Sequence, residues 1–535
     1  MLVELRVLRG PNADIPGPAI RVTLDRPGEP GLEVTDVVDR IARAADAWVG
    51  PAVSRAGSSG TIVVAFPWIR SGTGEAIGEG LVEVLRVGPA IPLEARIAAA
   101  AAAVRDADPG HAPDLVDPAV PTVAVTGTNG KTTTTRLLGR MAAQAGLVAA
   151  WSSTDGVFLD GACVDEGDWS GPGGARMVLS QPEVGFAVLE TARGGLMLRG
   201  MGVSAVDVAV FTNVSPDHLG LQGLDTVAQL AWAKSTVVRA VRRGGWAVLN
   251  AEDPLVRRYH DAGPGQPWFF AVDPLGEGAT VAAAVGAPLT TVQEGRIVVV
   301  GRDRGPIDLG AVRDIPVTIG GLSVENTANA LAAASAGLAA GLPATAVSAG
   351  LRSFPLDPVS SPGRMNVWSA PAADGGSTTV ILDFAHNEAG AQALMRVGLG
   401  LRQPGAALHA SIGNAGDRTD QGITDVGRIA AQAADTVQLA AKSNYLRGRS
   451  QAEIDALQRS GIVSVGKEPF DVVPDEPSGL RALLDRARDG DVIAMMIHQD
   501  RATCEALLTD AGSVVDTPER IAAKARAAAG QRSHR

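Results

Sequence analysis

The sequence predicts an α/β protein in which short strands alternate with helices. Apolar, β-branched segments recur along the chain and helix-like segments separate them, a pattern typical of parallel sheets covered by helices. The segment TVAVTGTNGKTTTT at residues 122–135 joins a strand to a helix through a glycine-rich turn, as phosphate-binding loops do. We expect a small N-terminal α+β domain, a central domain with the phosphate loop and a parallel sheet, and a smaller C-terminal α/β domain.

Composition narrows the classes of protein to consider. The 535 residues suggest several domains at roughly 150 residues each. A net charge of −11 argues against nucleic acid or an anionic membrane as the main partner. Cys163 and Cys504 lie far apart, which excludes a disulfide framework and favours a reducing compartment. The N-terminal segment is too polar for a signal peptide, and no apolar run is long enough to cross a bilayer, so we expect a cytoplasmic protein.

Residues 1–105 are expected to form the N-terminal domain. Its β-like segments lie at residues 4–8, 19–24 and 61–66, and its helix-like segments at residues 34–47, 74–87 and 93–104. Residues 106–120 are rich in Pro and Asp and have no periodicity, which predicts a linker.

Residues 121–359 are expected to form the central domain. Strands are predicted at residues 122–125, 185–189, 206–211 and 245–249, and helices at residues 131–146 and 226–242. In parallel sheets, ligands collect at the carboxyl ends of the strands. The polar residues that end these strands are therefore the candidates for a site: Thr126, Glu190, Thr212, Asn213 and Asn250.

Residues 360–535 are expected to form the C-terminal domain, because the segment FPLDPVSSPGR marks a boundary before it. Strands are predicted there at residues 380–382, 407–412, 436–440 and 492–497.

The phosphate loop carries the strongest chemical signal. Gly127 and Gly130 permit a tight turn close to a ligand, and Lys131 can neutralise a phosphate while the Thr132 hydroxyl holds Mg²⁺. The spacing GxxGKT is shorter than that of a general P-loop. A strand before this loop and a helix after it favour a nucleotide site.

Four further residues are candidates with open alternatives. Glu190 is either a Mg²⁺ ligand or an exposed glutamate at a strand end. An Asp-His pair in a polar loop, such as Asp217 and His218, is typical of a ligand or an orienting group. Lys234 lies within a predicted helix, where most lysines face solvent.

The motifs GTNGKTTT, ETARGG, TNVSPDHLG, LNAEDP, ENTANA, PGR and DFAHN occur in one order and together resemble those of the Mur ligase family. Members of that family are ATP-dependent ligases that form amide bonds. The resemblance extends from Pro121 to the C-terminus, and within the family it is greatest to the cyanophycin synthetases. The N-terminal segment ELRVLRGPN of this chain also resembles the start of those enzymes. Those enzymes carry an ATP-grasp ligase where this chain has only residues 106–120, so we expect the aspartate-adding step to be absent.

The resemblance implies ATP and Mg²⁺ as cofactors and a C-terminal domain of Rossmann-like fold. It also implies that a carboxylate takes the γ-phosphate of ATP and that an amine then displaces phosphate from the acyl phosphate. The phosphates would be held by Thr128, Asn129, Gly130, Lys131, Thr132 and Thr133. By the same resemblance, Thr132 and Glu190 hold one Mg²⁺, His218 binds a second, and Lys234 is a lysine that some members carbamylate beside the metal.

The remaining implied contacts concern the base and ribose. The resemblance places Asn250, Asn326 and Asn329 at the adenine, and Arg364 and Asp383 at the phosphates and ribose, with His386 and Asn387 close behind. The chain departs from the family pattern at Glu325, Phe384 and Glu388. It also has Ser443 and Asn444 after Lys442, where cyanophycin synthetases tend to carry an acidic pair, and this difference argues against arginine as the acceptor.

We therefore expect an ATP-dependent carbon–nitrogen ligase that joins a small or peptide-like carboxylate to an amine or amino acid. One alternative is a non-catalytic ATP-binding partner of a separate ligase, disfavoured by the joint presence of Lys131, Glu190, His218 and Lys234. Another is a mechanical or signalling P-loop NTPase, disfavoured by the short loop. The sequence leaves both substrates open, and also whether the protein is a homo-oligomer.

Overall fold

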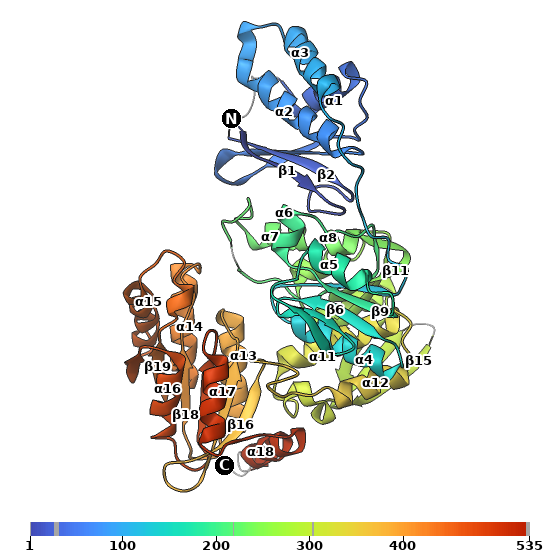
Figure 1. Cartoon of the computed structure of the whole chain (residues 1–535). Coiled ribbons are helices and arrows are strands. Elements are labelled where there is room, and N and C mark those ends of the chain that lie inside the picture. The colour runs from blue at the N-terminus through green and yellow to red at the C-terminus, as the bar shows by residue number, and fades with distance from the viewer. Residues whose placement is uncertain (1, 26–31, 218, 302–303, 531–535) are drawn as a thin grey trace. The chain divides into compact units, whose positions relative to one another are not determined.

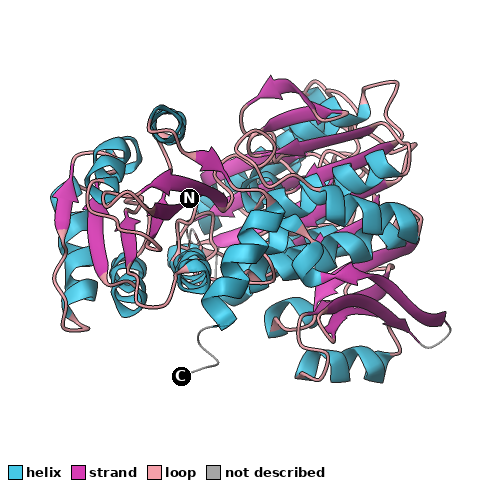
Figure 2. Ribbon diagram, turned by 90° about the horizontal axis from the view of Figure 1, so that it is seen from below, coloured by secondary structure: helices cyan, strands magenta, loops and turns pink. Residues whose placement is uncertain are grey.

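The computed structural model describes residues 2–25, 32–217, 219–301 and 304–530 (Figure 1). It divides into two compact units. Unit 1 comprises residues 1–291, 298–309 and 331–350, and unit 2 comprises residues 292–297, 310–330 and 351–535. Helices line both faces of the two larger sheets (Figure 2), which confirms the predicted α/β class. The division into domains at residues 105, 121 and 359 stays a prediction.

The N-terminal module, defined here as residues 2–106, is an antiparallel sheet covered by helices on one face (Figure 1). The strand order is β1-β2-β4-β3. The strands are β1 (Leu2–Leu8), β2 (Ala19–Leu24), β3 (Val53–Ala56) and β4 (Ile62–Pro67); the helices are α1 (Val34–Ala44), α2 (Ser71–Val87) and α3 (Leu93–Asp106), with short 3₁₀ turns η1 (Ser58–Gly60) and η2 (Gly88–Ala90). Ile20, Val22, Phe66, Ile77 and Leu81 pack in its core.

An eleven-stranded sheet follows, in the order β15-β14-β13-β12-β11-β10-β5-β9-β6-β7-β8. Its strands are β5 (Thr122–Thr126), β6 (Ala149–Ser153), β7 (Gly156–Leu159), β8 (Ala162–Glu166), β9 (Phe186–Glu190), β10 (Val206–Phe211), β11 (Val241–Asn250), β12 (Gln266–Ala271), β13 (Leu289–Gln293), β14 (Arg296–Gly301) and β15 (Arg304–Ala311). From β6 to β13 the pairs are parallel, whereas β6, β7 and β8 form an antiparallel meander at one edge. The phosphate loop leaves β5 near the middle of this sheet.

The helices that follow the phosphate-loop strand differ from the sequence expectation at one place. They are α4 (Lys131–Gln144), α5 (Pro172–Leu179), α6 (Arg193–Leu198), α7 (Val227–Lys234), α8 (Thr236–Arg239), α9 (Pro254–Arg257), α10 (Glu277–Val285), α11 (Val324–Ala339) and α12 (Ala344–Ser353), with 3₁₀ turns η3 (Val312–Asp314) and η4 (Pro316–Thr318). The single helix predicted at residues 226–242 is wrong. Ser235 and Thr236 donate their hydroxyls to the carbonyls of Trp232 and Ala233, both at 2.7 Å, and such bonds compete with the helical ladder.

The second large sheet belongs to unit 2 and has seven strands in the order β20-β19-β18-β21-β17-β16-β22. The strands are β16 (Asn366–Pro371), β17 (Ser377–Asp383), β18 (Leu408–Ile412), β19 (Thr436–Ala440), β20 (Asp471–Val473), β21 (Val492–Met496) and β22 (Val514–Val515). The helices are α13 (Glu388–Leu401), α14 (Asp420–Ala433), α15 (Gln451–Val463), α16 (Glu476–Leu484), α17 (Arg501–Asp510) and α18 (Pro518–Gly530), with 3₁₀ turn η5 (Ser443–Tyr445). The strands from β17 to β20 are parallel. Within the described part of the chain, no helix has the length and apolar character needed to span a membrane.

Candidate active site

The phosphate loop is fixed against the end of the neighbouring strand β10. Gly127 has φ 153°, and a Cβ built there would lie 1.9 Å from Thr212 Oγ1, so only glycine fits. Thr128 N donates to Asn213 O, and Asn129 N donates to Asn213 Oδ1, each at 2.9 Å. The turn is therefore held against the segment after β10 by backbone and amide contacts.

Helix α4 starts at the end of this loop, so the amides of its first turn lie beside the loop. Gly130 precedes it with φ 87°, and Thr134 N donates to Gly130 O at 2.9 Å. The earlier amides of the first turn have no acceptor within the helix, and a helix N-terminus favours an anion. Lys131 Nζ donates to Thr128 O at 3.0 Å, which places the ammonium group beside the same turn.

Thr132, the second residue of α4, and Glu190, the last residue of β9, form an oxygen pair. Strands β5 and β9 are paired in parallel, and Thr132 Oγ1 donates to Glu190 Oε2 at 2.9 Å. Glu190 is only 2% exposed, so the alternative of an exposed glutamate is wrong. A buried carboxylate joined to a hydroxyl beside a phosphate loop supplies the hard oxygen ligands that Mg²⁺ prefers, and the residues present fit that ion.

Lys234 reaches the loop from helix α7. Its side chain is buried at 4% exposure, and Nζ donates to Gly127 O at 2.6 Å. Burial lowers the pKa of Lys234 well below its usual value, and the nearby positive Lys131 lowers it further. Lys234 is therefore not a lysine that faces solvent. His218, the other predicted metal ligand of this region, lies outside the described residues.

Asn250 ends β11 on the same side of the sheet. Its Nδ2 donates to Thr212 O at 2.8 Å, and its Oδ1 accepts from Glu252 N at 2.9 Å. The amide thus fixes the turn after β11 beside the end of β10. Its predicted contact with adenine stays a prediction.

Asn326 and Asn329, in unit 2, are one turn apart in α11. Asn329 Nδ2 donates to Asn326 Oδ1 at 3.0 Å, and Asn326 N donates to Ser323 Oγ at 3.1 Å. Glu325, which departs from the family motif, pairs with Arg396 at 2.7 Å. Its carboxylate is therefore held by a neighbouring helix of the same unit.

Arg364 and Asp383 are brought together at the end of β17. Asp383 Oδ2 accepts from Met365 N at 2.8 Å, and the Arg364 guanidinium lies 5.1 Å from the Phe384 ring centre. Burial raises the pKa of Asp383 to about 6, although the Arg364 charge opposes this rise. Asn387 caps α13 by accepting from Gly390 N at 2.9 Å.

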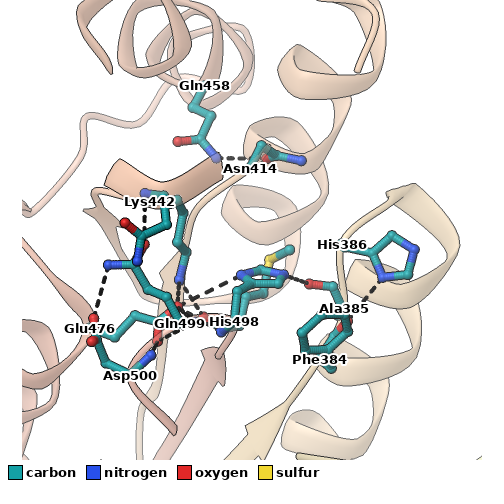
Figure 3. A network of polar contacts seen from close by, with 12 residues as sticks. Phe384, Ala385, His386, Asn414, Lys442, Gln458, Glu476, His498, Gln499 and Asp500 are labelled. Atoms are coloured by element: carbon teal, nitrogen blue, oxygen red, sulfur yellow. Dashed lines mark hydrogen bonds and ion pairs between the residues drawn. The ribbon is translucent and has the colours of Figure 1, made fainter. Parts of the chain in front are cut away.

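A buried polar network at the carboxyl end of the seven-stranded sheet escaped the sequence analysis (Figure 3). Lys442 and Glu476 form an ion pair with side chains 1% and 0% exposed. Glu476 also accepts from the backbone amides of His498 at 2.7 Å and Asp500 at 2.8 Å. His498 Nε2 lies 2.8 Å from Ala385 O. The pair therefore fixes the segment after β21 beside the segment after β17.

The family models match both parts of the chain that carry these residues. The Mur ligase middle domain matches residues 125–337, and the glutamate ligase domain of Mur ligases matches residues 363–496. A UDP-N-acetylmuramoyl-L-alanyl-D-glutamate–2,6-diaminopimelate ligase of Gloeobacter violaceus is 30% identical over 387 residues, which cover 70% of this chain and 72% of that protein. The chain belongs to the Mur ligase family. The recognition made from the motifs is thereby confirmed.

Among other Mur-type relatives, a cyanophycin synthetase of Synechocystis sp. is 35% identical over 378 residues, or 70% of this chain. The chain spans 42% of that protein's length. Two solved structures have a fold similar to that of this chain. E. coli FolC in complex with ADP has 19% identity and a TM-score of 0.54, over 74% of this chain and 90% of that chain. A bifunctional folylpolyglutamate synthase/dihydrofolate synthase has 22% identity and a TM-score of 0.50, over 74% and 91%.

Proposed function

We propose that this Mur ligase is an ATP-dependent carbon–nitrogen ligase that joins a carboxylate to an amine through an acyl phosphate. The observation that carries the proposal is the convergence of Lys131, Lys234 and the Thr132–Glu190 pair on one glycine turn. The names of the relatives support it, since they describe a ligase and a synthetase. Two FolC-type neighbours were solved with ADP or with Mn and AMPPNP.

The first chemical step makes the acyl carbon reactive. A substrate carboxylate oxygen bonds to the γ-phosphorus of ATP, and the bond from that phosphorus to the bridging oxygen breaks, so that ADP leaves. The loop amides and Lys131 hold the phosphate oxygens as charge builds on them, which is where fixed donors contribute most to rate. Thr132 and Glu190 would hold Mg²⁺, which neutralises phosphate charge when bound.

The second step forms the amide. The amine nitrogen bonds to the acyl carbon, the bond from that carbon to the phosphate oxygen breaks, phosphate leaves and the amine loses a proton. The protein contributes mainly by placing the two reactants, since correct placement alone supplies a large part of such a rate enhancement.

Lys234 has the properties of a lysine that reacts with CO₂. Its lowered pKa favours the neutral amine, which is the form whose nitrogen lone pair bonds to CO₂ with loss of a proton. The resulting carbamate would add an anionic oxygen pair beside Gly127 and Glu190. This assignment rests on the pKa direction together with the contact from Nζ to Gly127 O.

The substrates are a carboxylate and an amine of amino-acid or peptide type. The competing function, a non-catalytic ATP-binding partner, requires no buried lysine at the loop, and Lys234 is buried there.

One experiment tests the function directly. Purified protein with Mg-ATP is offered a panel of acidic amino acids and acidic peptides, each with and without a panel of amino acids as acceptors. We expect ADP release that requires the carboxylate, and a product whose mass equals the two substrates less water. If no combination releases ADP above the level of Lys131→Met, which lacks the loop ammonium, the ligase assignment is wrong.

A further inference from the structure

The N-terminal module is joined to the remainder of unit 1 by backbone contacts with the segment after α6. Arg9 N donates to Arg199 O at 2.6 Å, and Gly202 N donates back to Arg9 O at 3.0 Å. A Cβ built at Gly200 would lie 2.3 Å from Arg9 O. The two segments therefore approach more closely than any side chain at that position permits, and the module has a defined place in the unit.

A second contact joins the module to helix α7, which carries Lys234. The Arg55 guanidinium of β3 lies 4.9 Å from the centre of the Trp232 ring, and the Arg239 guanidinium lies 5.9 Å from the same ring. Arg55 is itself fixed, because its Nε donates to the buried Asp14 carboxylate at 2.7 Å. Figure 1 shows β1 and β2 of the module next to α6 and α7. Trp232 thus receives one cation from the module and one from the end of α8.

The position of Trp232 within α7 gives this contact its importance. Each residue turns an α-helix by about 100°, so residues two apart point to opposite sides. Trp232 faces Arg55 of the module, whereas Lys234 is directed to the phosphate loop, with Nζ 2.6 Å from Gly127 O. Helix α7 has eight residues and lies between the module and the loop. A shift at one of its faces is therefore transmitted to the other.

The module also contacts the segment that follows Asp217. A Cβ built at Gly223 would lie 3.5 Å from Ser58 N, and Arg193 Nη1 donates to Leu221 O in the same segment at 3.3 Å. The N-terminal module thus lies close to the segment around Gly223 as well as to helix α7.

We propose that Arg55 is a positioning residue of the ligase reaction, which acts through Trp232 to hold α7 and hence the Lys234 side chain at the phosphate loop. This rests on the proposed function. The N-terminal module is then part of the catalytic assembly, because it fixes the outer face of the helix whose inner face carries Lys234.

The test compares three variants in the full-length protein. Arg55→Ala removes the cation over Trp232, Arg55→Lys keeps a weaker one, and Arg86→Ala is the matched control, since Arg86 is an exposed arginine of the same module paired only with Glu83 in the contacts described. We expect Arg55→Ala to lower kcat by about 10-fold or more, because small displacements of a reacting group cost this much. The KM for ATP changes less than kcat, Arg55→Lys restores part of kcat, and Arg86→Ala behaves as wild type.

A second measurement separates this proposal from the function on which it rests. Hydrogen exchange of residues 227–234 is measured without any substrate, and Arg55→Ala is expected to accelerate it whereas Arg86→Ala does not. If Arg55→Ala does not fold, Trp232→Phe, which has a smaller ring, replaces it in this measurement. The proposal is wrong if folded Arg55→Ala, or folded Trp232→Phe in its place, shows wild-type exchange in α7, or if its kcat equals that of Arg86→Ala while the wild type turns over. Absence of ligase turnover in the wild type contradicts the proposed function alone.

Discussion

The Nζ atom of Lys234 lies 2.6 Å from the carbonyl oxygen of Gly127. These residues are 107 positions apart in the chain, yet they join a helix after β10 to the first residue of the phosphate loop after β5. A lysine that faced solvent would have no such contact. The bond shows that the helix and the loop are in direct contact, and the following predictions start from it.

Lys234→Ala is expected to be nearly inactive. The substitution removes the only amine that donates to the loop from α7, and with it the group that can carry a carbamate. Short-chain carboxylates such as acetate or propionate are expected to restore part of the activity, because they place an anionic oxygen pair in the space left. ADP release with and without these anions is the measurement. Lys234→Arg fills that space and should show no recovery; full activity in Lys234→Ala would contradict the role.

Lys131→Met is expected to lower turnover by about 10³-fold, since loss of charge neutralisation at a phosphate costs several kcal/mol in the transition state. Methionine keeps most of the length of the side chain, so the fold should be unchanged. Steady-state ADP release is compared with that of Lys467→Ala, which removes a lysine that donates to Ala431 O and Ala434 O, both at 2.7 Å, in unit 2. Equal rates in the two variants would exclude the phosphate assignment.

Glu476→Gln is expected to destabilise the protein by about 3–5 kcal/mol, because it leaves a buried lysine without its counter-charge. The substitution also removes the charged acceptor of the His498 and Asp500 amides. Urea unfolding gives the free energy. Glu468→Gln, which breaks the exposed pair with Arg459 at 3.2 Å, should change stability by less than about 1 kcal/mol. The double variant Lys442→Met/Glu476→Gln should recover part of the lost stability. Equal free energies of unfolding for Glu476→Gln and Glu468→Gln would contradict the argument.

Asp383 should give the protein a pH-dependent stability of defined sign. Burial raises the pKa of Asp383 to about 6, whereas an unfolded aspartate has a pKa of about 3.9. Between these values the folded state keeps a proton that the unfolded state releases, so the free energy of unfolding falls as pH rises from about 4 to about 6. The fall attributable to this residue is up to about 3 kcal/mol.

Asp383→Asn removes this titration and keeps an oxygen for Met365 N. Its stability relative to wild type should therefore increase as pH rises through the same window and then stay constant. Asp510→Asn, at an exposed site, is the control and should run parallel to wild type. Urea unfolding is measured at intervals between about pH 4 and about pH 7 to compare the three proteins. A curve for Asp383→Asn that runs parallel to wild type would refute the assignment of this pH dependence to Asp383.

Much of the fold follows from local patterns in the sequence. The strand predicted at residues 206–211 is β10 itself, and the helix predicted to start at Lys131 starts there. The meander of β6, β7 and β8 was not predicted, although Asp160 and Gly161, with φ 49° and φ 87°, are the Asp-Gly pair that two-residue hairpin turns favour. That signal was present in the sequence and was overlooked.

The residues of the candidate site also fall into those that the sequence predicts and those that only the structure reveals. Glu190 and the phosphate loop are local features, because a polar residue that ends an apolar strand is readable from the strand alone. Lys442 and Glu476 are not, since 34 positions separate them and each looks like an ordinary surface charge. Only the packing of β19, α16 and β21 shows that both are buried. The contact of Arg55 with Trp232 is hidden for the same reason, as it joins residues of two predicted domains.

The last strand of the eleven-stranded sheet has a consequence for the behaviour of the protein at high concentration. Because β8 ends the sheet, one of its sides has no neighbouring strand among the described residues, and such an edge can recruit a strand from another molecule into a fibrous or amorphous aggregate. Val164 is exposed there, but β8 has only five residues and ends in Asp165 and Glu166. Two like charges at the same edge repel an incoming copy of the strand, and so keep the molecules apart.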